Sequence, residues 1–122
     1  MKVEGLEGKR VLVVEDEMLV CMDIEDMLAE FGCIVVGPAP SVDRAMKVIA
    51  MEQFDVAMLD LNLAGKPSYP IADHLAENNI PFMLASGYAD VRPDHADRPR
   101  LQKPFMKSEL RDKLLETIQG VM

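Results

Sequence analysis

Two short apolar runs in this chain end in carboxylates, and this repeated pattern limits the possible folds more than any other feature. Residues 11–14 are followed by Glu15 and Asp16, and residues 56–59 are followed by Asp60. Short, continuous apolar runs predict buried parallel strands. Because functional groups in open α/β sheets collect at the carboxyl ends of the strands, the three carboxylates should lie together.

Three carboxylates in one dry site require a cation. Two like charges ~4 Å apart repel by about 4 kcal/mol at an effective dielectric of 20. A hard dication with oxygen ligands, above all Mg2+, meets this requirement. The sequence therefore predicts a Mg2+ site formed by Glu15, Asp16 and Asp60.

Strand-like and helix-like segments alternate five times along the chain. Apolar runs predict strands at about 10–15, 34–38, 55–60, 81–86 and 100–102. Helical periodicity and end signals predict helices at about 17–31, 42–52, 70–78 and 107–120, with Ser41 as a cap of the second. Between Ser86 and Lys103, Pro93 and Pro99 leave room only for a short or irregular fourth helix. These five units predict an α/β fold with a doubly wound, five-stranded parallel sheet.

Composition limits the class of protein. At 122 residues the chain is expected to form one domain, 1–122, with a core of about 9–120. The net charge of −8 argues against nucleic-acid binding, although residues 92–122 carry more basic than acidic residues. No apolar stretch is long enough to span a membrane, and no signal peptide precedes the first strand. Cys21 and Cys33 lack metal-site spacing, so they are expected to be free thiols in a reducing compartment, which predicts a cytoplasmic protein.

Four sequence blocks, each at the end of an expected strand, resemble the signature blocks of two-component response-regulator receiver domains. They are residues 13–17, 58–62, 84–88 and 101–105. The similarity runs from about Lys9 to Gly120. It implies a flavodoxin-like (βα)5 fold with strand order 2-1-3-4-5, and it suggests a stand-alone receiver.

The resemblance also implies a role for several residues in the four blocks. It implies that Asp60 accepts a phosphoryl group from a sensor histidine kinase or a histidine phosphotransfer protein, and that Asp60, Asp16 and Glu15 bind Mg2+ together with the backbone carbonyl of Asn62. The Ser86 hydroxyl would move toward the phosphoryl group, and the Lys103 ammonium would pair with that group. The Lys103–Pro104 bond is expected to be cis. Such a protein would be no enzyme beyond its own Mg2+-dependent phosphorylation and dephosphorylation.

The chain departs from the usual receiver pattern at two places. Arg100 occupies the position where receivers commonly have an aromatic switch residue, and the aromatic Tyr88 instead follows Ser86 by two residues. This arrangement resembles a subset of stand-alone receivers with an altered fourth helix, and it makes Ser86 and Tyr88 the expected switch residues. After Asp60, the dipeptide Ala64-Gly65 stands where Pro-Gly is common.

Three functions fit the strand-end aspartate to different degrees. An aspartyl-phosphate hydrolase of the haloacid dehalogenase type needs an acid two residues after the nucleophile, and Asn62 is there instead. A pseudo-receiver, which binds partners without phosphorylation, normally lacks one of the acids or the lysine. We therefore expect a phosphorylatable receiver that acts on an unknown downstream protein, with the pseudo-receiver as the alternative.

Three further expectations concern the surface. Leu19 and Met22 should face the acidic side of the first helix, close to Asp60, and contact a phosphoryl donor. Residues 88–113 are rich in basic side chains and should form the output surface. His74 and His95 are expected at the surface without a metal role.

Overall fold

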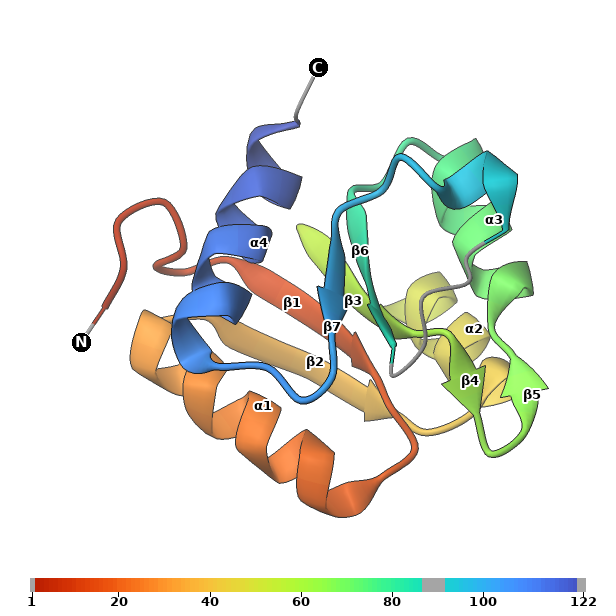
Figure 1. Ribbon diagram of the computed structural model, residues 1–122, viewed down its shortest axis with the longest axis horizontal. Helices are drawn as coiled ribbons and strands as arrows, with labels where there is room; N and C mark the ends of the chain where they lie inside the picture. Colours follow the sequence, from red (N-terminus) through yellow and green to blue (C-terminus); the bar gives the residue numbers. More distant parts are fainter. Residues whose placement is uncertain (1, 87–91, 121–122) are drawn as a thin grey trace.

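The computed structural model describes residues 2–86 and 92–120 of the chain, and these form one open sheet covered by helices (Figure 1). The sheet strands are β1 (Arg10–Val14), β2 (Ile34–Ala39), β3 (Val56–Asp60), β6 (Phe82–Ser86) and β7 (Arg100–Gln102). The helices are α1 (Met18–Phe31), α2 (Val42–Met51), α3 (Tyr69–Glu77) and α4 (Lys107–Gln119), with a short 3-10 helix η1 (Pro93–His95). A two-stranded hairpin, β4 (Asn62–Leu63) and β5 (Lys66–Pro67), follows β3.

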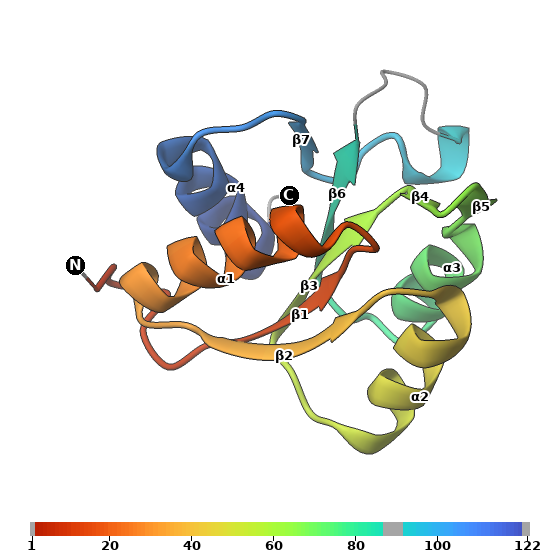
Figure 2. The ribbon, with the colours of Figure 1, turned by 90° about the horizontal axis from the view of Figure 1, so that it is seen from below.

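All neighbouring strands of the five-stranded sheet are parallel, in the order β2-β1-β3-β6-β7. This is the predicted order 2-1-3-4-5, because β6 and β7 are the fourth and fifth strands of the sheet. Helices α1 and α4 cover one face of the sheet and α2 and α3 cover the other (Figure 2). The predicted doubly wound, flavodoxin-like fold is therefore confirmed.

The three central strands, β1, β3 and β6, are buried on both faces, which explains their continuous apolar sequences. Along β1, Val11 and Val13 pack in the cluster beneath α1 and α4, whereas Leu12 and Val14 pack in the cluster beneath α2 and α3. Alternate side chains of a strand point to opposite faces, so a strand covered on both sides needs apolar residues at every position. This burial fixes which strand ends meet at one edge.

Within the described part of the predicted fourth-helix segment, residues 92–102, the helix is the single turn of η1, since Pro93 and Pro99 interrupt it. Ser41 caps α2 as expected: its hydroxyl accepts a hydrogen bond from the Arg44 backbone N–H at 3.1 Å. Across the described residues, no helix is long and apolar enough to cross a membrane.

Both cysteines are buried free thiols, as expected, and they lie at opposite ends of α1. The Cys21 Sγ is 3.4 Å from the backbone carbonyl of Glu15, whereas the Cys33 Sγ is 3.4 Å from that of Leu6. Burial raises the pKa of both thiols, and for Cys21 the nearby Glu15 carboxylate adds to this effect.

The β4–β5 hairpin was not predicted from the sequence. Its two turn residues, Ala64 and Gly65, have φ values of 52° and 85°. Two successive positive φ values are typical of a type I′ hairpin turn. Proline at position 64 could not adopt this turn, because its ring holds φ near −65°. A receiver with Pro-Gly at these two positions must therefore have a different loop conformation from this chain.

We predict opposite effects for substitutions at the two turn residues. Ala64→Gly should raise the free energy of unfolding by about 0.5–1 kcal/mol, because glycine accepts positive φ without a steric penalty. Gly65→Ala should lower it by about 1 kcal/mol, since no atom crowds the added Cβ and only the backbone conformation is penalised. Urea denaturation of both variants checks the pair, and equal changes in the same direction would contradict the type I′ turn.

Candidate functional site

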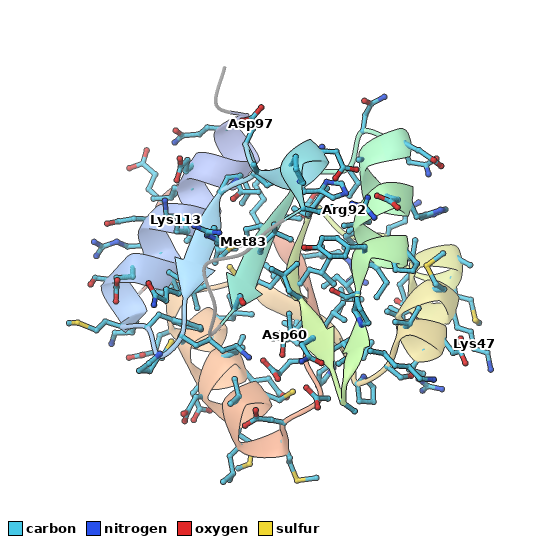
Figure 3. The ribbon with its side chains drawn as sticks, turned by 45° about the vertical axis from the view of Figure 1, so that its right-hand side comes forward. Lys47, Asp60, Met83, Arg92, Asp97 and Lys113 are labelled. Carbon is cyan, nitrogen blue, oxygen red and sulfur yellow. The ribbon has the colours of Figure 1, made fainter. Side chains whose placement is uncertain are left out.

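The carboxyl edge of the sheet brings together the functional residues expected there. Asp60 is the last residue of β3, and Glu15 directly follows β1. Asp60 pairs with Ala85 in register, which places Ser86 one residue beyond it on β6. Lys103 directly follows β7, and its backbone N–H donates to the carbonyl of Ser86 at 2.8 Å. The labelled Asp60 marks this edge in Figure 3.

The Lys103 ammonium binds two carboxylates at once. Its Nζ lies 2.5 Å from Glu15 Oε1 and 3.0 Å from Asp60 Oδ2. Glu15 is only 2% exposed and Asp60 is 8% exposed, so both contacts are largely shielded from water. The peptide bond between Lys103 and Pro104 is cis. A single cation therefore joins the ends of β1, β3 and β7.

One oxygen of each carboxylate accepts a hydrogen bond from a backbone N–H. Asp60 Oδ1 accepts from the N–H of Asn62 at 3.1 Å, and Glu15 Oε2 accepts from that of Glu17 at 3.2 Å. Asp16 Oδ2 accepts from the N–H of Ala64 at 3.0 Å, which ties the hairpin to the end of β1. These contacts orient all three carboxylates toward one small volume.

The protonation behaviour of the site follows from burial and from this one cation. Burial raises the pKa of Glu15, and the nearby Asp60 charge acts in the same direction, although the Lys103 hydrogen bond opposes both. Burial by itself disfavours the charge of Lys103, but the hydrogen bonds to Glu15 and Asp60 outweigh it and raise the pKa of the ammonium. Lys103 therefore stays charged at neutral pH, and Glu15 depends on it.

One carboxylate oxygen from each of Glu15, Asp16 and Asp60 lies within 4.8 Å of the other two. An all-oxygen donor set of this spacing fits a small, hard dication such as Mg2+. Asp16 is at least partly exposed, so one side of the cluster is open to water and to an incoming ligand. The side chain of Asn62 is used within the hairpin, where its Oδ1 accepts from the Gly65 N–H at 2.8 Å.

Of the two expected switch residues, the structure describes Ser86 alone. Ser86 is 6% exposed at the end of β6, next to the carboxylate cluster in the sheet. Tyr88 lies outside the described residues. Arg100, at the position where receivers commonly have an aromatic, is exposed on the edge strand β7. Among the residues that the structure describes, Ser86 is thus the switch candidate.

A second polar cluster, which the sequence did not reveal, lies beside α3. It contains Asp73, Asp94 and His95, together with the guanidinium of Arg92. The expectation that His95 is a surface residue is wrong: it is 3% exposed, with its Nε2 2.8 Å from Asp73 Oδ1. Sequence reasoning missed this cluster because only the tertiary fold brings Asp73 to the Pro93–Pro99 segment.

Replacing Lys103 tests whether the ammonium compensates the buried carboxylates. Without Mg2+, in EDTA, Lys103→Met should lower the free energy of unfolding near pH 7 by about 1–3 kcal/mol, because two shielded carboxylates lose their cation. The variant should raise the pKa of Glu15 further, so its folded state binds more protons than its unfolded state. Its deficit should therefore shrink as the pH falls toward the ordinary glutamate value of 4.5.

A matched control for this experiment is Lys107→Met. Lys107 pairs with Glu30 at 3.0 Å, but both side chains are about half exposed. Its loss should cost well under about 1 kcal/mol, with little dependence on pH. Urea denaturation between pH 4.5 and pH 7.5 compares the two, and equal costs for both lysines would contradict the compensating role of Lys103.

The chain is similar to known signalling proteins over most of its length. A family model described as the response regulator receiver domain matches residues 11–115. The transcriptional regulatory protein PdtaR of Mycobacterium tuberculosis is 29% identical over 110 residues, covering 84% of this chain and 53% of that protein. The chain therefore spans about half the length of this relative.

Two solved structures show the same fold at higher identity. SdrG from Sphingomonas melonis Fr1 superposes with a TM-score of 0.79 at 35% identity, covering 90% of this chain and 95% of that chain. The BeF3-activated conformation of SdrG from Pseudomonas melonis Fr1 superposes with a TM-score of 0.78 at 37% identity, covering 89% and 95%. With the family match and the carboxylate site at the sheet edge, these similarities identify the chain as a member of the response regulator receiver domain family.

Proposed function

We propose that Asp60 is a phosphoacceptor that receives a phosphoryl group from a phosphohistidine on a sensor histidine kinase or a histidine phosphotransfer protein. The observation that carries this proposal is the single ammonium of Lys103 on both Asp60 and Glu15, with Asp16 beside them. Phosphoryl transfer depends mainly on positioning and on charge stabilisation, and this edge supplies both. Family membership supports the same conclusion.

The transfer uses few protein groups. A carboxylate oxygen of Asp60 bonds to phosphorus while the phosphorus–nitrogen bond to the donor imidazole breaks, and the imidazole keeps the electron pair. Lys103, already on Asp60 Oδ2, would neutralise charge on the phosphoryl oxygens, and Ser86 would contact the same group. Mg2+, held by Glu15, Asp16, Asp60 and the Asn62 carbonyl, would supply the remaining positive charge.

The pseudo-receiver remains the alternative, and labelling separates it from a phosphoacceptor. With acetyl phosphate and Mg2+, intact-mass spectrometry should detect one added phosphoryl group in the wild type. Asp60→Asn should remove the label, while Asp16→Ala or EDTA should reduce it strongly because the cation site is lost. Asp43→Asn, on the exposed first turn of α2, is the control and should label normally. A wild type that takes no label under these conditions would favour the pseudo-receiver.

Exposed apolar side chains beside the site support a donor-docking role. Leu19 is 77% exposed and Met22 is 54% exposed, both near the start of α1, which begins four residues after β1. Met18 adds a third exposed apolar side chain. Solvent-exposed apolar residues gathered beside a functional edge are typical of protein contacts.

Leu19→Ala tests this docking surface. It should slow phosphotransfer from a protein donor about tenfold, since exposed apolar contacts become buried in a complex, and leave labelling by acetyl phosphate unchanged. Met51→Ala is the matched control, because Met51 is 83% exposed at the opposite end of the sheet, near the start of β3. Rapid-quench assays with both donors measure the difference, and equal slowing with acetyl phosphate would contradict docking.

We further propose that the output surface is formed by η1, β7 and α4 and that its downstream partner is a protein of mixed charge. Local pairing supports mixed over purely acidic chemistry: on α4, Lys107 pairs with Glu30, Arg111 with Asp112, and Lys113 with Glu116. We expect neither nucleic acid nor a membrane as a partner, and no enzymatic turnover beyond self-phosphorylation and dephosphorylation. A cytoplasmic location is part of the same proposal.

A further inference from the structure

Five residues hold the segment of residues 92–98, which precedes β7, against helix α3. Tyr69 and Asp73 belong to α3, and Arg92, Asp94 and His95 belong to the segment. The Arg92 backbone N–H donates to the Tyr69 hydroxyl at 2.8 Å, and its guanidinium lies 4.5 Å from the centre of the Tyr69 ring. The same guanidinium contacts Asp73 and bonds both carboxylate oxygens of Asp94 at 2.7 Å. We call these five residues the α3 latch. Figure 3 shows Arg92 between η1 and α3.

His95 is the buried centre of the α3 latch. Its ring stacks on Tyr69, with the centroids 6.1 Å apart and the planes at 7°, and meets the edge of Phe82 at 5.8 Å. Its Nε2 faces Asp73 Oδ1 at 2.8 Å, while its Nδ1 is buried without a hydrogen-bond partner among the described residues. An unsatisfied buried nitrogen costs free energy, and the remaining contacts of the ring must offset that cost. The Tyr69 ring and Asp73 make those contacts.

The α3 latch does not need a metal ion. Asp73, Asp94 and His95 have the spacing of a metal site, but the guanidinium of Arg92 already contacts both carboxylates. Hydrogen bonds from His95 and Arg92 lower the pKa of Asp73, and those from Arg92 lower that of Asp94. The cluster therefore contains its own cation and acts as a fastening between two segments.

The α3 latch is connected to the phosphoacceptor through one residue. Ser68 is fully buried and immediately precedes Tyr69, and its hydroxyl donates to the backbone carbonyl of Asp60 at 2.6 Å. Its backbone N–H also donates to the carbonyl of Leu61 at 3.0 Å. A change in the backbone at Asp60 would therefore reach the first turn of α3 directly, and Tyr69 stands at that turn.

We propose that the dipeptide Ser68-Tyr69 couples the state of Asp60 to the position of residues 92–98, with Ser68 as a positioning residue for the Asp60 carbonyl and Tyr69 as the platform of the α3 latch. The coupling rests on the proposed phosphorylation, whereas the fastening of residues 92–98 does not. This arrangement gives an aromatic residue outside β7 the function of linking the site to the output surface. Such coupling requires contacts that differ between the two states of the protein.

The fastening is tested in the unmodified protein by hydrogen exchange of residues 92–98. Tyr69→Leu should speed exchange there by roughly tenfold, because the segment loses its ring platform and its hydroxyl acceptor. Tyr69→Phe keeps the ring and should affect mainly the Arg92 amide. Asp73→Asn keeps the shape of the side chain but removes its charge, and it should also speed exchange. If Tyr69→Leu fails to fold, exchange in Asp73→Asn alone tests whether residues 92–98 are fastened to α3.

The matched control is His74→Ala, a change on the same helix outside the α3 latch. It should leave exchange of residues 92–98 unchanged. Wild-type exchange rates in both Tyr69→Leu and Asp73→Asn would overturn the fastening. Circular dichroism of each variant verifies that helix α3 and the sheet are intact.

The coupling is tested with beryllofluoride and Mg2+. Exchange of residues 92–98 should change in the wild type, and this response should fall at least about threefold in Ser68→Ala and in Tyr69→Leu. Beryllofluoride binding, followed by fluorine NMR, should persist in both, and Ser68→Thr should restore the response because it keeps the hydroxyl. His74→Ala should respond as the wild type does.

The failures of the two proposals are distinguishable. If the wild type binds no beryllofluoride and takes no label from acetyl phosphate, the proposed function fails and the coupling fails with it, while the fastening is still decided by exchange in the unmodified protein. If the wild type is labelled but residues 92–98 do not respond to beryllofluoride, the coupling is overturned and the proposed function stands. The same holds if these residues respond as strongly in Ser68→Ala and Tyr69→Leu as in the wild type.

Discussion

The ion pairs of Lys103 with Glu15 and Asp60 are the interaction on which the rest of the site depends. Burial raises the free energy of a charged carboxylate, and two carboxylates at one strand edge repel each other. The ammonium at the end of β7 offsets both penalties, and β7 lies two strands from β3 and three strands from β1 in the sheet. The site is consequently assembled only when the parallel sheet is complete.

Much of the fold follows from short-range features of the sequence. The apolar runs at β1, β3 and β6 are continuous because both faces of these strands are covered, and the acids and the lysine follow strands whose carboxyl ends necessarily share an edge. The positions of Glu15, Asp16 and Asp60 could therefore be predicted without knowing any helix boundary accurately, whereas the pairing of Lys103 was implied by the resemblance to receiver domains. Pro93 and Pro99 likewise indicated a short fourth helix.

The features that the sequence did not reveal all depend on tertiary contacts. The hairpin at Ala64-Gly65 has two-residue strands and lacks the Asn-Gly or Asp-Gly signal of a type I′ turn, and its Ala64 N–H is used by Asp16 from another strand end. His95, in the proline-rich stretch, was expected at the surface. Instead its ring stacks on Tyr69 of α3 and its neighbour Arg92 pairs with Asp73 of the same helix, and these contacts shield the imidazole from water.

The thiols of Cys21, in α1, and Cys33, just after α1, are two built-in chemical probes. Cys21 contacts the carbonyl of Glu15 at the carboxyl edge of the sheet, and Cys33 contacts that of Leu6 at the opposite edge. Both are buried with raised pKa values, so alkylation requires local opening of the structure around each one. The ratio of the two alkylation rates therefore compares local opening at the carboxylate edge with local opening at the other edge of the sheet, and no cysteine has to be introduced.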